Sequence, residues 1–108
     1  EYGHDGDWQG KKQSIEIIDN SFFGPLLRKL NIQNTLFVIS GDHSTPCIKN
    51  SHSDDPVPLL LSGCNVKTDG SERFTEYWGQ KGRLGLMMGE QILGQLLKAR
   101  MKNWIKKA

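Results

Sequence analysis

The chain has 108 residues, which is enough for one small domain or for part of a larger one. Fourteen basic and twelve acidic residues give a net charge of +2, and no apolar run approaches the roughly 18 residues that a membrane span requires. The N-terminus has no signal-peptide core, and the two cysteines form neither a CxxC pair nor a disulfide framework. We therefore expect a soluble, cytoplasmic protein with reduced thiols that act as small buried residues.

Basic residues concentrate at the C-terminus. We expect them to form a solvated helix end, because cations favour helix C-termini, and we expect neither a nucleic acid nor a membrane as partner. The residues concerned are Lys98, Arg100, Lys102, Lys106 and Lys107. The chain starts with Glu1 rather than Met, inside a polar motif, which suggests the boundary of a fragment.

The first predicted element is a helix between Gly10 and Leu30. Its apolar residues recur at helical spacing and predict one buried face: Ile15, Ile18, Phe22, Leu26 and Leu30. Gly24 and Pro25 interrupt this pattern. Because proline lacks a backbone donor and crowds the preceding turn, we expect a kink or break near Phe23.

Two short strands and a long polar loop follow. The run 36–40 is apolar without alternation, which is typical of a strand covered on both faces and favours a parallel α/β sheet. Residues 41–56 are too polar for a core and too numerous for a simple turn, so we expect a functional loop. Residues 57–62 predict the second strand, with Pro56 and Pro58 at its entry.

The last predicted element is a long C-terminal helix, beginning near Leu84 and reaching Ala99. Apolar residues at Met88, Ile92 and Leu96 support the helical period. Three glycines in this region each weaken a helix by roughly 1 kcal/mol against alanine, so close packing on the sheet is expected there.

All three histidines of the chain lie in polar loops beside predicted element ends, at His4, His43 and His52. Asp42 and His43 leave the first strand together, so both side chains can turn towards one metal ion. Imidazole and carboxylate groups suit zinc, manganese or magnesium, and mixed sets are common in two-metal enzymes. We therefore predict a shared metal site from these residues, although their spacing does not identify the metal.

Other roles remain open for the neighbouring carboxylates. Asp42 could serve in an Asx-turn, and Asp7 could cap the helix that begins near Trp8. Asp5 is ambiguous. Asp54 and Asp55 are expected to face solvent or to orient His52.

These motifs together resemble the archaeal-type, cofactor-independent phosphoglycerate mutases of the alkaline phosphatase superfamily. The resemblance rests on Gly-His-Asp-Gly-Asp at 3–7, Ile-Glu-Ile-Ile-Asp at 15–19, Asp-His-Ser-Thr-Pro-Cys at 42–47 and His-Ser-Asp-Asp-Pro-Val-Pro at 52–58. It continues through Phe-Thr-Glu at 74–76 and Gly-Arg-Leu-Gly at 82–85, and it places the chain in the C-terminal part of such an enzyme.

The resemblance implies an isomerase that interconverts 3-phosphoglycerate and 2-phosphoglycerate through a phosphoserine intermediate, without 2,3-bisphosphoglycerate. It implies two divalent metal ions, with His4 and His52 as ligands of one and Asp42 and His43 as ligands of the other. It also implies that residues 1–108 are an incomplete α/β/α sandwich with a mainly parallel sheet and flanking helices.

Several parts of the family pattern fall outside this sequence. The aspartate that precedes the His4 motif, the nucleophilic serine and the substrate-binding domain are among them, so no catalytic residue is assigned here. We expect this fragment to be inactive alone and to self-associate through exposed strand edges. Two alternatives remain: another phosphotransferase or phosphatase of the superfamily, and a non-catalytic metal-binding module.

Overall fold

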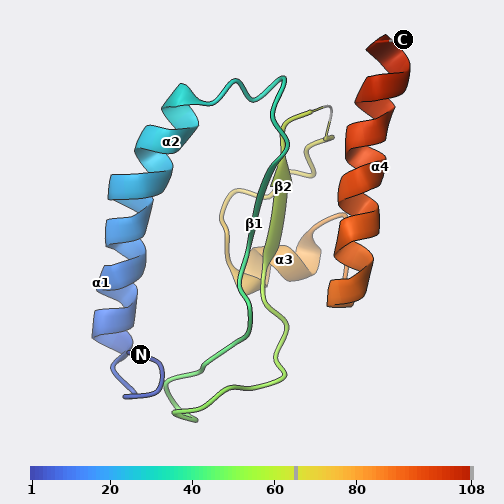
Figure 1. Cartoon of the computed structure of the whole chain (residues 1–108). Helices are drawn as coiled ribbons and strands as arrows, with labels where there is room; N and C mark the ends of the chain where they lie inside the picture. Colours follow the sequence, from blue (N-terminus) through green and yellow to red (C-terminus); the bar gives the residue numbers. More distant parts are fainter. Residues whose placement is uncertain (65, 108) are drawn as a thin grey trace. The chain divides into compact units, whose positions relative to one another are not determined.

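The computed structural model describes residues 1–64 and 66–107 (Figure 1). The chain divides into two compact units, which are treated separately below. The first contains Glu1–Leu30 and Asp42–Pro56, and the second contains Asn31–Gly41 and Val57–Ala108. The side chains predicted to form a basic, solvated helix end at Arg100, Lys102, Lys106 and Lys107 lie outside the part described.

A nearly continuous helical rod dominates the first unit (Figure 1). It consists of α1 (Trp8–Ile18), the π-helical segment η1 (Asp19–Phe23) and α2 (Gly24–Lys29). Asp7 begins the rod, because its carboxylate accepts a hydrogen bond from the Gly10 amide at 2.9 Å. This confirms the capping role that was one of two readings of Asp7.

The predicted irregularity near Phe23 takes the form of η1. The Gly24 amide bonds to the Asp19 carbonyl five residues back, so the turn before Pro25 is wider than an α-helical turn. The chain keeps helical dihedrals at Phe23 and Gly24 instead of breaking. A π-turn lets the helix pass the proline without the clash that an ordinary turn would bring.

The apolar face predicted to be buried along this rod is largely exposed. No residue of α1, η1 or α2 is buried, and the exposed fractions are 60% for Ile15, 48% for Ile18 and 56% for Phe22. The periodicity correctly indicated an amphipathic helix. Burial, however, needs a second apolar surface, and the first unit supplies only the rod and a polar loop.

The second unit contains two strands, β1 (Phe37–Ser40) and β2 (Leu59–Ser62), which lie side by side (Figure 1). They pair antiparallel, with Phe37 opposite Ser62 and Ser40 opposite Leu59. A parallel pairing was expected, and in the described residues it is not found. The physical reason is the connection: a loop without a crossover helix returns the chain beside β1 in the opposite direction.

Two helices follow the strands: α3 (Glu76–Lys81) and α4 (Gly89–Lys107). The C-terminal helix was predicted to begin near Leu84, but it begins five residues later, at Gly89. Gly85 adopts a φ of 65°, which interrupts the helical path. Among hydrophobic side chains that the structure describes, Cys64 is the one that is buried. Cys47 is half-buried, and neither cysteine forms a disulfide.

Candidate metal centre

The first candidate ligand, His4, sits in a tight turn just before α1. Backbone hydrogen bonds close this turn, from the Asp5 amide to the Glu1 carbonyl (3.1 Å) and from the Asp7 amide to the Tyr2 carbonyl (2.9 Å). Gly3 is buried within it, and a Cβ there would lie only 2.6 Å from the Thr45 carbonyl oxygen. The absence of a side chain at position 3 thus allows the N-terminal turn to approach the loop that carries His43.

The other candidate ligands come from the loop between β1 and β2. Ser44 and Ser53 form an isolated antiparallel bridge, in which the Ser53 amide donates to the Ser44 carbonyl at 3.0 Å. His43 and His52 each flank one of these serines, so the bridge brings them together across nine residues of sequence. Asp42 directly precedes His43 and lies in the same segment of the chain that leads to Ser44.

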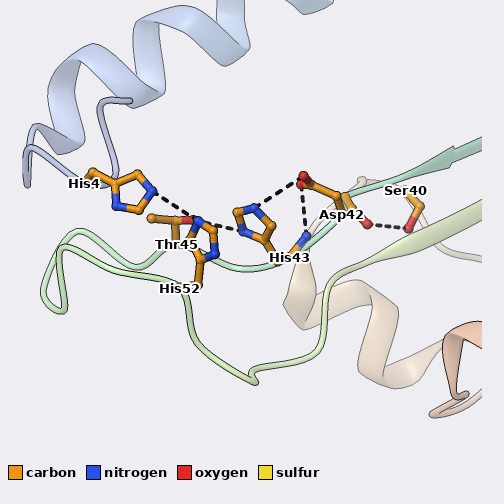
Figure 2. A network of polar contacts seen from close by, with 7 residues as sticks. His4, Ser40, Asp42, His43, Thr45 and His52 are labelled. Carbon is orange, nitrogen blue, oxygen red and sulfur yellow. Dashed lines mark hydrogen bonds and ion pairs between the residues drawn. The ribbon is translucent and has the colours of Figure 1, made fainter.

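The four predicted ligands form a row, His4, His52, His43 and Asp42, with Thr45 beside it (Figure 2). The Nε2 atoms of His4 and His52 are 3.2 Å apart. The rings of His52 and His43 stack with centroids 3.6 Å apart. His43 Nε2 lies 3.3 Å from a carboxylate oxygen of Asp42. The structure therefore brings together the residues that the sequence indicated.

These distances provide a test of fit for a divalent cation. Two ligand atoms held tetrahedrally at about 2.0–2.1 Å from zinc lie roughly 3.3 Å from each other. The separations of 3.2 Å for His4 with His52 and 3.3 Å for Asp42 with His43 both match that value. These separations are those of a hydrogen bond and an ion pair, and they also leave the members of each pair close enough to reach one ion.

Each pair supplies only half of a four-ligand coordination sphere. Within residues 1–64 and 66–107, no three His, Cys, Asp or Glu side chains converge on one point. All four ligand residues are exposed, including His43 and Asp42 with exposed side-chain fractions of 39% and 87%. The described residues therefore do not form a closed four-ligand site.

Three further residues support the row and were not singled out from the sequence. The Asn50 carbonyl accepts a hydrogen bond from His4 Nδ1 (3.2 Å), and the Thr45 hydroxyl lies 3.2 Å from His43 Nδ1. Lys11 Nζ donates to the Thr45 carbonyl at 2.9 Å and ties α1 to the loop. Asn50 has a positive φ, a conformation that asparagine tolerates, but the sequence offers no signal for Thr45 or Lys11.

The carboxylate of Asp55 accepts a hydrogen bond from the Ser53 hydroxyl at 2.6 Å. It is therefore held within its own loop segment. Asp54 and Asp5 are exposed. The orientation of His52 by Asp54 or Asp55 stays a prediction.

Comparison with known proteins places the chain in a family. A model described as "Metalloenzyme superfamily" matches residues 1–98. The chain belongs to the metalloenzyme superfamily. Within the superfamily it is similar to archaeal 2,3-bisphosphoglycerate-independent phosphoglycerate mutases, as the sequence motifs indicated. The match to one from Pyrococcus abyssi is 43% identical over 91 residues, and a match from Methanococcus maripaludis is 40% identical over 97 residues.

These matches cover 84% and 90% of this chain but only 22% and 24% of the relatives. This metalloenzyme-superfamily chain therefore spans less than a quarter of their length. A solved structure, that of the PH0037 protein from Pyrococcus horikoshii, is similar with a TM-score of 0.86 and 38% identity. That similarity covers 92% of this chain and 30% of the other.

Proposed function

We propose that this chain is the metal-binding, C-terminal part of a 2,3-bisphosphoglycerate-independent phosphoglycerate mutase. The complete enzyme would interconvert 3-phosphoglycerate and 2-phosphoglycerate through a phosphoserine intermediate in glycolysis and gluconeogenesis. The observation that carries the proposal is the proximity of the candidate ligands, with His4 Nε2 3.2 Å from His52 Nε2 and His43 Nε2 3.3 Å from the Asp42 carboxylate. Similarity to mutases over the same residues supports it.

In this proposal the two pairs hold two divalent ions, which are manganese, magnesium or zinc. Such ions neutralise charge on a transferring phosphoryl group and lower the pKa of an attacking hydroxyl. The residues of this chain hold the ligand atoms in place: the Ser44–Ser53 bridge aligns two histidines, and Gly3 lets the turn bearing His4 approach. The nucleophilic serine, the remaining ligands and most substrate contacts would come from the rest of the mutase.

The remaining features of the proposed protein follow from the same assignment. The complete fold would be an α/β/α sandwich in which a mainly parallel sheet extends beyond β1 and β2. The substrate would be a small phosphorylated acid, and the enzyme would act in the cytoplasm. No helix in the described residues has the length and apolar character needed to cross a membrane.

The test is a chimaera in which residues 1–98 of this chain replace the matching segment of the Pyrococcus abyssi relative. We expect it to convert 3-phosphoglycerate to 2-phosphoglycerate with added manganese and without 2,3-bisphosphoglycerate. His52→Ala should lower that activity by about 100-fold or more, because it removes a ligand, a larger change than the 10–100-fold typical of outer-shell losses. Lys49→Ala, in the exposed part of the same loop, is the matched control and should leave the activity unchanged.

Different outcomes would favour the alternatives. A folded, metal-loaded chimaera that hydrolyses phosphate esters but does not isomerise phosphoglycerate would point to a phosphatase of the same superfamily. Metal binding without either activity would instead favour a non-catalytic metal-binding module. The isolated chain is expected to lack turnover in every case.

A further inference from the structure

Asn50 ends a short turn, and its backbone carbonyl group points at His4, a candidate metal ligand. Its amide donates to the Pro46 carbonyl at 3.1 Å, and its φ is 54°, in the left-handed region. Its carbonyl oxygen lies 3.2 Å from His4 Nδ1. A carbonyl oxygen can only accept a hydrogen bond, so Nδ1 of His4 must carry the ring proton. The lone pair of the neutral ring is then on Nε2, the atom that faces His52.

We propose that Asn50 is a positioning residue that sets the tautomer and direction of the His4 imidazole for metal binding. The inference rests on the proposed role of His4 as a ligand. Metal-bound histidines generally donate their second ring N–H to a carbonyl or carboxylate, which fixes the ring and raises its basicity. The Asn50 carbonyl oxygen is such an acceptor, 3.2 Å from His4 Nδ1.

The residue type at position 50 matters because of its backbone conformation. Asparagine and glycine enter the left-handed region readily, whereas β-branched residues do so at a substantial cost. The surroundings leave little freedom for adjustment: a Cβ at Gly6 would lie 3.0 Å from the Asn50 side-chain oxygen and 3.4 Å from the Cys47 carbonyl oxygen. Gly6 also has a positive φ of 68°. The N-terminal turn at Gly6 therefore lies close to both the Asn50 side chain and the Cys47 backbone carbonyl of the turn at 46–50.

The contact between His4 and His52 also determines which ring nitrogen of His52 carries the proton. With His4 Nε2 as acceptor at 3.2 Å, His52 carries its proton on Nε2 and donates it across that gap in the metal-free chain. To bind a cation through Nε2, His52 would need the other neutral tautomer, with its proton on Nδ1. His4, by contrast, keeps its Nδ1 proton throughout.

The test compares Asn50→Gly with Asn50→Val in the whole 108-residue chain. Glycine keeps the left-handed conformation without the side chain, whereas valine opposes that conformation. Nitrogen-15 NMR of the imidazoles in the metal-free chain should show the Nδ1–H tautomer of His4 in the wild type and in Asn50→Gly. It should show a shift towards Nε2–H in Asn50→Val. Titration with Zn²⁺ alone should give a Kd about 10–100-fold higher for Asn50→Val than for Asn50→Gly.

An Nε2–H tautomer at His4 in the wild type, as an unfolded chain would show, overturns the inference. Loss of the Nδ1–H tautomer in Asn50→Gly also overturns it, since the side chain rather than the backbone would then be responsible. Equal tautomers and equal Zn²⁺ affinities in the two variants do the same. An Nδ1–H tautomer that responds to Asn50→Val in a chain without Zn²⁺ affinity supports the positioning of the ring and contradicts the proposed metal function instead.

Discussion

Thr45 contacts His43 on the side of the ring opposite Asp42. Its hydroxyl lies 3.2 Å from His43 Nδ1, while Nε2 faces the Asp42 carboxylate. A hydroxyl can donate or accept, so it can remain bonded to Nδ1 whether the ring proton is on Nδ1 or on Nε2. Thr45 is therefore suited to hold His43 both with and without a bound ion.

Thr45→Val should weaken Zn²⁺ binding by the chain about 10-fold, whereas Thr45→Ser should retain it, because only the hydroxyl is needed. Valine matches the shape of threonine, which makes serine and valine a controlled pair. Isothermal titration calorimetry of both variants checks the expectation. Equal affinities for the two would show that the hydroxyl does not support His43.

Asp69 joins the segment after β2 to the loop that follows α3. One carboxylate oxygen accepts from the Arg83 amide at 2.7 Å, and the other accepts from the Ser71 amide at 3.1 Å. The Arg83 guanidinium also donates to the Thr68 carbonyl at 3.2 Å. The Arg83 amide first, and then Ser71, lower the pKa of Asp69 from 3.8 to about 2.

This depressed pKa predicts a pH dependence for the connection between these loops. Because the folded pKa lies below the unfolded value, the stabilisation is present above about pH 3.8 and is lost as the pH falls through about 2. The amide proton shifts of Arg83 and Ser71 should titrate together with a midpoint near 2. Asp69→Asn should abolish that titration, and a midpoint at the ordinary 3.8 would show that the carboxylate is not bound by these amides.

For the helices and strands, the sequence predicted the type of each element better than it predicted how the strands pair. The apolar runs identified β1 and β2 to within two residues at each end, and the interruption at Gly24-Pro25 located η1. The antiparallel pairing was missed, because an apolar strand pattern does not contain its direction relative to a neighbour. The start of α4 was missed because Leu84 continues the helical period, although Gly85 leaves the helical conformation.

Many large apolar side chains among the described residues are exposed to solvent. The exposed fractions are 63% for Ile17, 56% for Phe22 and 64% for Leu93. Where such side chains gather into a large exposed patch, the patch usually marks a contact with another protein surface. The chain spans less than a quarter of its mutase relatives, so further parts of a complete mutase are the proposed cover for these side chains.

We expect the isolated chain to self-associate, and replacing exposed apolar residues on the helical rod should reduce this. Ile17→Lys combined with Phe22→Ser should shift the sedimentation of the chain towards monomer across a dilution series. Lys12→Ser, on the exposed surface of the same helix, is the control and should have no such effect. A wild-type chain that sediments as monomer at every concentration would contradict this expectation.

The sequence by itself determined which residues are candidate metal ligands, which loop carries three of them and which family their motifs resemble. These features are local, because ligand type and spacing are written directly in the residues around His4, Asp42, His43 and His52. Only the tertiary structure decided which candidate ligand atoms lie close together, that Asn50 and Thr45 contact them, and that β1 and β2 run antiparallel. The contacts of His4 with His52 and Asn50 and the strand pairing join residues distant in sequence, and no local pattern specifies them. The contact of Thr45 with His43 is local, but the residue types alone do not show it.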